Sequence, residues 1–542
     1  MGAPSARAPG GGRGAPAGRG AAVSPLASRR AAGVLFLVAL AGCPAPSRLS
    51  SVNGALSTGP RPGWFPKERC HETQPTDRAA CYKPWTVLIN MAADNDLVPY
   101  AYLNLFEMES QDAAGTRAAS TERTDVVVQL DTPGPGGLRR LLMLSQGERY
   151  DQSLTLEQLA RRREGDVRSP VIEELAEGAD AAEQLRGFLE WGARRYPAEH
   201  YMVVVWGHGE GWAAAQRRPG ASGEPKERPP LPEVPTAMDD PFGGRFRGGL
   251  AFDWTQRSYL DIPALADALQ AMGRTVGRPV DVYAADACLM QMAEVATELR
   301  DSARFIVSSA YLQDFVGLPY RSLLAGLNQS SGPPDGGGGG GDPARQLALS
   351  IPGLSEESLD PARNPLRGRI AAELRKRFTM SVVATDELRR DLLPALGDLG
   401  AALDAYQAED PLRTGDLRYL FEHQTGLYGS IQDLGAFLGA LKAQLAERAR
   451  QGVATGPVSE RLQAAIAHAR AALDGAVPAY RFGTDYQADG QSELGLRALT
   501  VWLPVSEGDF RTRIDDYRAS ALYHYGGEPG PWQRFIERLY PQ

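Results

Sequence analysis

A histidine and a cysteine occupy equivalent places in this 542-residue sequence, each just past an apolar, strand-like run. His208, flanked by glycines, follows the run 201–206, and Cys288 follows the run 280–284. Since a helical pattern separates the two runs, they are predicted to be parallel strands of one sheet. The carboxyl ends of parallel strands share one edge of a sheet, so we expect the imidazole and the thiol to face the same crevice. This arrangement is typical of a cysteine nucleophile with its general base.

Each of these residues also has an ordinary structural interpretation. The apolar neighbours of Cys288 would suit a small buried residue, and His208 could be a simple turn histidine. We favour catalysis because both residues lie at strand ends, and because a helix predicted over 289–299 would direct its amide dipoles at a thiolate. The sequence shows no transition-metal spacing of His, Cys and carboxylates, no Gly-x-Ser-x-Gly segment and no phosphate-binding loop.

Strands and helices alternate through the first half of the chain. This order predicts an α/β fold: a mostly parallel sheet flanked by helices on both faces, with a helical C-terminal extension. The expected elements are the strands 85–91, 125–130, 141–143, 201–206, 250–253, 280–284 and 304–308, and the helices 97–109, 179–195 and 262–272. A late strand is expected at 496–503.

Composition divides the chain into six parts. We expect a signal peptide with an N-terminal extension (1–43), a tether (44–80), a catalytic domain (81–328) with an exposed Pro/Gly-rich insertion (213–248), a Gly-rich linker (329–343), a mainly helical region (344–485) and a final segment whose strand returns to the core (486–542). The net charge of −8 is not gathered in one block, and nucleic acid is not an expected partner.

The N-terminal part resembles a bacterial lipoprotein signal. An apolar run at 31–42 follows two arginines, is short for a membrane span, and closes on Leu-Ala-Gly before Cys43. We expect Cys43 to carry a lipid that anchors the protein to a membrane in the bacterial cell envelope, periplasmic or surface-exposed. An ordinary secretory signal with a chance cysteine is the alternative. In an oxidising compartment Cys70 and Cys81 are expected to form a disulfide, which leaves Cys288 as a free thiol.

Four segments resemble, in chain order, those of the clostripain family of cysteine peptidases. They are 85–97 with Glu107-Met108, Trp206 to Gly209, Asp286 to Met290, and the late segment ending at Pro504; Asp253-Trp254-Thr255 also fits. The resemblance covers about 85–325 and the late strand. It implies a caspase-like fold, a histidine–cysteine dyad at His208 and Cys288, and cleavage of protein or peptide substrates after basic residues.

The resemblance also implies roles for neighbouring residues. The backbone N–H groups of Gly209 and Cys288 would hold the oxyanion. Asp286 would help to bind the P1 side chain, although it could equally cap a helix. Aligning Gly317 with the family's usual pocket loop places Val316 where an acid is expected, and Asp314 lies two positions earlier as a second substrate-binding candidate.

Other features of the sequence allow more than one interpretation. The insertion 213–248 corresponds to the region where family members cut themselves, and its basic residues are candidate sites, but it could be a passive loop. No cofactor is expected, and for calcium Asp94, Asp96 and Asp131 are too scattered to define a site. We expect a monomer. The alternative function is a non-catalytic envelope lipoprotein that uses the same fold as a binding scaffold.

Overall fold

The computed structural model describes residues 82–541 with gaps at 112–113, 135–136, 147–152, 154, 156–157, 159–160, 162–165, 177–179, 213–247, 330–340, 373, 424–425 and 489–494. The expected signal peptide, the tether, the lipidated Cys43 and the Cys70–Cys81 pair lie outside these residues. So do 213–247 of the insertion and most of the Gly-rich linker. No helix within the described ranges is both long and apolar enough to cross a bilayer.

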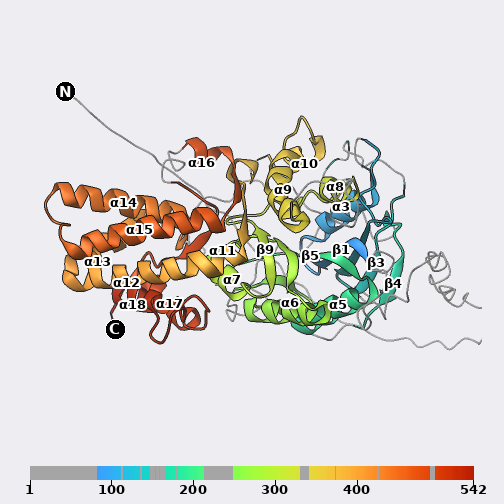
Figure 1. The fold of residues 1–542 in the computed structure, drawn as a ribbon. Coiled ribbons are helices and arrows are strands. Elements are labelled where there is room, and N and C mark those ends of the chain that lie inside the picture. The colour runs from blue at the N-terminus through green and yellow to red at the C-terminus, as the bar shows by residue number, and fades with distance from the viewer. Residues whose placement is uncertain are drawn as a thin grey trace, which may run out of the picture. The chain divides into compact units, whose positions relative to one another are not determined.

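A nine-stranded sheet forms the centre of the fold, in the order β13-β10-β9-β8-β5-β1-β2-β3-β4. Figure 1 shows β9, β5, β1, β3 and β4 of this sheet. The five strands from β9 to β2 are parallel to one another, and each strand outside them is antiparallel to its inner neighbour. The predicted mostly parallel sheet is therefore confirmed. The bounds are β1 Lys83–Ala92, β2 Thr124–Asp131, β3 Arg139–Leu142, β4 Val171–Glu174, β5 Ala198–Trp206, β8 Val280–Asp286, β9 Ala303–Ser308, β10 Thr379–Ala384 and β13 Ala479–Phe482.

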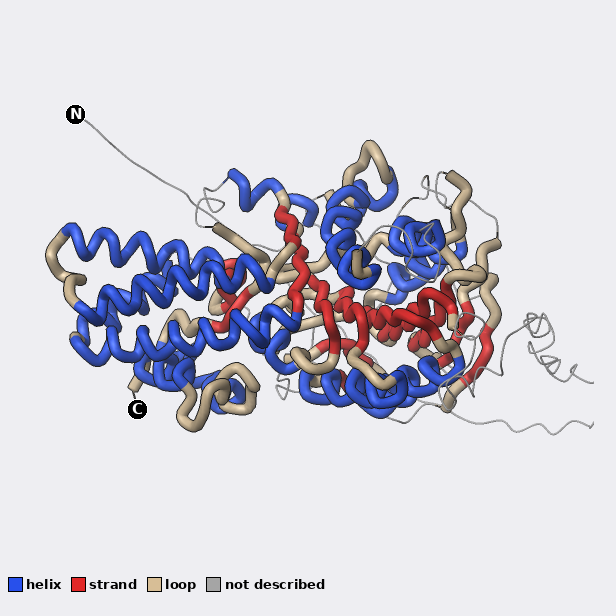
Figure 2. Tube along the Cα trace, viewed as in Figure 1, coloured by secondary structure: helices blue, strands red, loops and turns tan. Residues whose placement is uncertain are grey.

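Helices cover both faces of this sheet (Figure 2). The central strands are apolar at consecutive positions because both faces are buried: Val203 and Val205 pack into one core, and Met202 and Val204 into the other. One core is closed by α5 Ala181–Arg195 and α6 Ile262–Val276, and the other by α3 Val98–Glu109, α8 Tyr320–Gln329 and α9 Pro343–Ser358.

The region after the linker is largely helical, as expected, but it also completes the main sheet. Strands β10 and β13 come from within it and extend the sheet beyond β9. Its helical elements are α10 Pro365–Ile370, η3 Leu374–Arg377, α11 Thr385–Glu387, η4 Leu388–Leu392, α12 Leu393–Glu409, α13 Pro411–His423, α14 Leu434–Arg450, α15 Pro457–Ala476, α16 Thr484–Ala488, α17 Glu507–Tyr517 and α18 Pro531–Leu539.

The late strand is shorter than predicted. β14 Thr500–Trp502 pairs with β12 Ile431–Asp433, which pairs with β11 Gly426–Tyr428 in a separate three-stranded sheet. β14 reaches the segment after Cys288, because the N–H of Thr500 donates to the carbonyl of Gln291 at 2.9 Å. A two-stranded sheet, β6 Leu250–Asp253 with β7 Ser258–Leu260, follows the insertion.

Candidate active site

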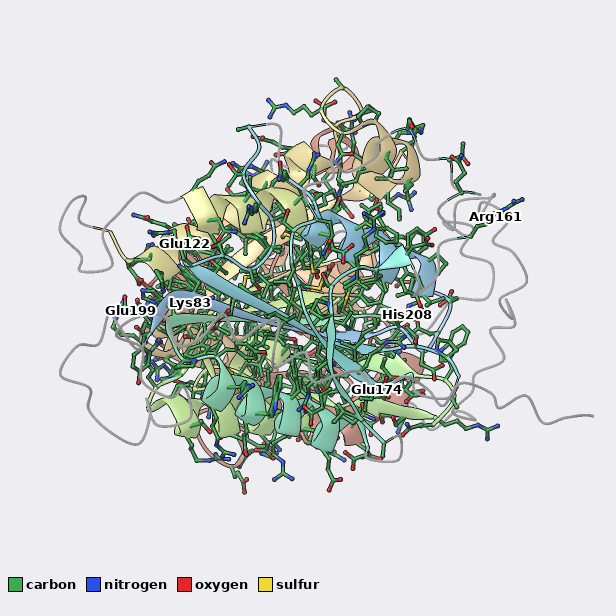
Figure 3. All side chains as sticks on the ribbon, turned by 90° about the vertical axis from the view of Figure 1, so that its right-hand side faces the viewer. Lys83, Glu122, Arg161, Glu174, Glu199 and His208 are labelled. Atoms are coloured by element: carbon green, nitrogen blue, oxygen red, sulfur yellow. The ribbon has the colours of Figure 1, made fainter. Side chains whose placement is uncertain are left out.

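His208 and Cys288 leave the sheet side by side. β5 and β8 are neighbouring parallel strands with Trp206 paired to Asp286, so each of the two residues lies two positions beyond the same rung. The N–H of Gly207 extends this contact by donating to the carbonyl of Asp286 at 3.2 Å. Figure 3 shows His208 at the end of the sheet opposite Lys83, which begins β1. Adjacent strands therefore deliver an imidazole and a thiol to one edge.

The backbones of Gly209 and Cys288 are in contact. A Cβ at position 209 would lie 2.5 Å from the carbonyl oxygen of Cys288 and 3.2 Å from its nitrogen, so only glycine fits. Among the described residues, the backbone N–H groups of Gly209 and Cys288 donate no hydrogen bond. Two backbone donors thus remain available beside the thiol.

The imidazole of His208 is framed by two side chains. Its Nε2 lies 2.6 Å from Oδ1 of Asp96, in the turn between β1 and α3. The ring of Trp254 lies nearly parallel to it, with 5° between the planes and 6.4 Å between the centroids. The His208 carbonyl accepts the N–H of Ala251 at 3.0 Å, which fixes the backbone on the far side.

The thiol of Cys288 is held in its neutral form. Burial raises its pKa to about 12, and the carboxylates of Glu210, Asp286 and Asp314 contribute to this, although Sγ accepts the N–H of Gln313 at 3.3 Å. The residue itself is partly exposed.

The expected helix over 289–299 is wrong in its start, and so is the expected dipole effect on Cys288. α7 runs from Ala293 to Glu298, because the residues before it lie along the chain that follows β9. The backbone N–H of Leu289 donates to the carbonyl of Tyr311 at 2.8 Å, and that of Gln291 donates to the carbonyl of Ser309 at 3.0 Å. With no helix starting at the thiol, no row of free amides opposes its burial.

Asp286 has its carboxylate occupied by protein donors. Oδ2 accepts the N–H of Leu318 at 2.8 Å and the hydroxyl of Tyr320 at 2.9 Å, while Oδ1 accepts the side-chain amide of Gln313 at 3.2 Å. Burial raises its pKa to about 6. These contacts organise the segment 311–320, the pocket loop. Gly317 in this loop needs a positive φ of 68° and would meet Asp286 at 2.5 Å if it had a Cβ.

Asp314 keeps one carboxylate oxygen unused. Its Oδ1 accepts the N–H of Val316 at 3.0 Å, whereas Oδ2 is buried and has no hydrogen-bond partner among the described residues. Burial raises the pKa of Asp314 to about 6, and the nearby Asp286 adds to the shift. Val316 itself is fully buried in the core, so its side chain belongs to the packing. Phe315 is 37% exposed and stacks on Tyr100.

The pocket loop is fastened from behind by Arg367, on α10. This fully buried guanidinium binds Glu107 on α3, with Nη1 2.9 Å from Oε2. It also donates to the carbonyls of Gly317 and, at 3.3 Å, Leu318. The role of Arg367 was not predicted, because no local pattern marks an arginine that is 260 residues from its partner.

The acidic residues considered for calcium do not gather. In the part of the chain that the structure describes, no group of three or more His, Cys, Asp or Glu residues is placed to hold a metal ion. Asp96 instead binds His208.

A family comparison agrees with this geometry. The model of the clostripain family of peptidases matches residues 89–222 and 245–336, which include both His208 and Cys288. The resemblance to this family is thus confirmed over the matched residues. The match identifies a cysteine endopeptidase, as the resemblance implied.

Solved structures of clostripain-family enzymes align at low identity. An inactive zymogen C11 protease from Parabacteroides distasonis is 17% identical, with 83% of this chain and 99% of that chain covered and a TM-score of 0.48. A secreted C11 cysteine protease from Bacteroides thetaiotaomicron, iotapain, is 14% identical, with 82% and 98% covered and a TM-score of 0.48. No curated protein matches the sequence.

Proposed function

We propose that this clostripain-family domain hydrolyses peptide bonds with Cys288 as nucleophile and His208 as its proton-transfer partner. The observation that carries the proposal is the pairing of Trp206 with Asp286, which brings the two residues off adjacent strands at one sheet edge. The unused N–H groups of Gly209 and Cys288 support the same site as an oxyanion hole.

The chemistry follows from the neutral thiol. His208 takes the thiol proton while Sγ bonds to the scissile carbonyl carbon, and the carbonyl π electrons move to oxygen. The oxyanion accepts hydrogen bonds from the N–H groups of Gly209 and Cys288, and each such donor is typically worth about 100- to 1,000-fold in kcat. The C–N bond then breaks, and the leaving amine takes the proton from His208. Water hydrolyses the thioester by the reverse transfers, so that the thiol is restored.

We assign the P1 preference for Arg or Lys mainly to Asp314. Its buried Oδ2 lacks a partner within the described residues, so a cationic substrate side chain would complete its hydrogen bonds. Asp286 lies close enough to influence the pKa of Asp314 but is occupied by the loop. Asp286 therefore supports the pocket by shaping the loop and adding negative charge.

We further propose that the protein is exported and works as a lipid-anchored monomer in the cell envelope. The support is the run 31–42 that ends before Cys43 in the sequence. Labelling cells with a radioactive fatty acid tests the anchor: Cys43→Ser should lose the label while the wild type keeps it.

A peptide library that varies P1 tests the catalytic proposal. The wild type should cleave after Arg and Lys, and both Cys288→Ala and His208→Ala should be inactive. Asp314→Asn should lower kcat/KM by about 100-fold for Arg and Lys substrates and leave slow cleavage after small apolar residues unchanged. The exposed change Asp301→Asn is the matched control. Cleavage that survives in Cys288→Ala would refute the proposal, and no cleavage by any variant would favour the scaffold.

Self-processing in 213–248 is a separate part of the proposal. Intact-mass analysis should show cut chains for the wild type and only the full-length mass for Cys288→Ala. Finding only full-length chains in both proteins would remove self-processing and leave the peptidase proposal standing.

A further inference from the structure

We propose that Asp96 is a positioning residue that fixes the ring and the tautomer of His208. The inference rests on the proposed dyad and adds a third side chain to it. Asp96 lies 112 residues before His208, and no sequence pattern joins them.

The contact determines which nitrogen can act. An ionised carboxylate only accepts hydrogen bonds, so Nε2 of His208, 2.6 Å from Oδ1 of Asp96, must carry its hydrogen. Nδ1 is then the nitrogen with a free lone pair, the one able to take a proton from a thiol. When the ring becomes an imidazolium during the reaction, the same carboxylate stabilises the new charge.

Asp96 is itself held firmly by its neighbour. The side-chain amide of Asn95 donates to the carbonyls of Ala92 at 3.0 Å and Phe252 at 2.8 Å, and its oxygen accepts the N–H of Leu97 at 2.9 Å. Asn95 is almost fully buried. The turn that carries Asp96 is thus tied both to the end of β1 and to β6.

Trp254 closes the arrangement. Its backbone N–H donates to the carbonyl of Asp94 at 2.9 Å, and its indole ring lies nearly parallel to the imidazole. The turn 94–96 and the segment 252–254 therefore form a frame, with the carboxylate at one edge of the His208 ring and the indole along its face. Both His208 and Asp96 remain partly exposed, at 32% and 20%, so a substrate can reach the imidazole.

Steady-state kinetics of the full chain test the role. Asp96→Asn should lower kcat by about 1,000- to 10,000-fold, because an amide that donates to Nε2 selects the wrong tautomer. KM should change less than about threefold, since Asp96 does not contact substrate. The kcat of Asp96→Glu should be at least tenfold higher than that of Asp96→Asn. Asp301→Asn, a substitution at an exposed residue, should have the kcat of the wild type.

Nitrogen-15 NMR of labelled histidine gives a readout that a structural role would not move. The His208 signal, assigned by its loss in His208→Ala, should show hydrogen on Nε2 in the wild type and on Nδ1 in Asp96→Asn. Wild-type kcat or an unchanged tautomer in Asp96→Asn would overturn the inference while the dyad stands. Full activity of His208→Ala would refute the dyad itself.

Discussion

Asp281 and Asp286 lie at the two ends of the same buried strand, β8, and their surroundings displace their pKa values in opposite directions. Burial raises the pKa of Asp281, but hydrogen bonding to His200 and the guanidinium of Arg278 outweigh it and lower the value to about 2. Asp286 accepts hydrogen bonds from neutral donors, and burial raises its pKa to about 6. One end of the strand is a structural anchor, and the other presents one carboxyl group, that of Asp286, near the thiol.

The anchor at Asp281 should make the fold sensitive to acid. A carboxyl whose pKa is lowered on folding stabilises the protein above its unfolded value of 3.8, and this stability is lost as the pH falls towards 2. Asp281→Asn should lower the free energy of unfolding by about 2 kcal/mol at pH 7, because the partly exposed guanidinium groups of Arg278 and Arg304 lose their buried carboxylate partner. Urea denaturation at pH 7 and pH 3 checks this.

In that experiment the difference between Asp281→Asn and wild type should shrink at pH 3. Asp301→Asn, in a half-exposed ion pair with Arg389, should change the stability by less than about 0.5 kcal/mol. An equal loss at both pH values would show that the Asp281 charge is not the cause.

The neutral thiol should make Cys288 slow towards simple alkylating agents. With its pKa raised to about 12, the thiolate fraction at pH 7 is far below that of a free cysteine. Iodoacetamide should therefore label it about 10- to 100-fold more slowly than a free thiol, after allowing for the greater nucleophilicity of the more basic thiolate. The rate should rise steadily between pH 7 and 9.

Glu210→Gln should speed this labelling, because it removes a carboxylate that raises the thiol pKa. Glu199→Gln, near the start of β5 at the opposite end of the sheet, should leave the rate unchanged (Figure 3). A peptide-directed electrophile should label Cys288 much faster than iodoacetamide does. Fast labelling at pH 7 with a plateau below pH 8 would contradict the neutral thiol.

The two ends of the insertion should tolerate its removal. The backbone N–H of Gly249 donates to the carbonyl of Gly211 at 2.8 Å, and that of Glu210 donates to the carbonyl of Gly249 at 2.9 Å. The two chain segments that flank 213–247 are therefore already paired. Trp212 is held separately by an edge-on contact with Tyr517 at 4.8 Å. Replacing 213–247 with Asn-Gly, which favours a tight hairpin, should preserve folding and keep kcat/KM within about fivefold.

Melting temperature and peptide cleavage check this shortened chain, and the same deletion in Cys288→Ala is the inactive control. The shortened chain that keeps Cys288 contains no insertion to cut, so it should be active without processing. A folded but inactive shortened chain would mean that the insertion takes part in the site.

The contact between α7 and the C-terminal segment should weaken as the pH rises. Glu294 is fully buried, accepts the N–H of Trp502 at 2.9 Å and the hydroxyl of Tyr517 at 3.3 Å, and burial raises its pKa to about 7. The folded protein keeps this proton while the unfolded chain releases it above pH 4.5, so stability falls between pH 4.5 and 7.

Glu294→Gln should remove that dependence. Its free energy of unfolding should match the wild type near pH 4.5 and exceed it by about 1–3 kcal/mol at pH 8. Glu507→Gln, on the exposed side of α17, is the matched control. A variant that is less stable than wild type at pH 8 would contradict the buried, protonated carboxyl.

The sequence predicted the central sheet because its strands are apolar on both faces, a pattern that is typical of a doubly covered parallel sheet. β1, β5 and β8 lie close to their expected ranges, and α3, α5 and α6 begin within two residues of theirs. The short strands β10 and β13 were not predicted, because four to six residues inside a helix-rich region carry no distinctive periodicity.

Local pattern determined what could do chemistry in this protein: a histidine among glycines and a lone cysteine, each following a buried strand. Tertiary structure decided how they are set. It placed Asp96 against the imidazole, left Asp314 with an unused oxygen and started α7 too late to favour a thiolate. It also brought Arg367 behind the pocket loop from a part of the chain outside the family match. These are contacts between separate segments of the chain or effects of burial, and neither leaves a mark in local spacing.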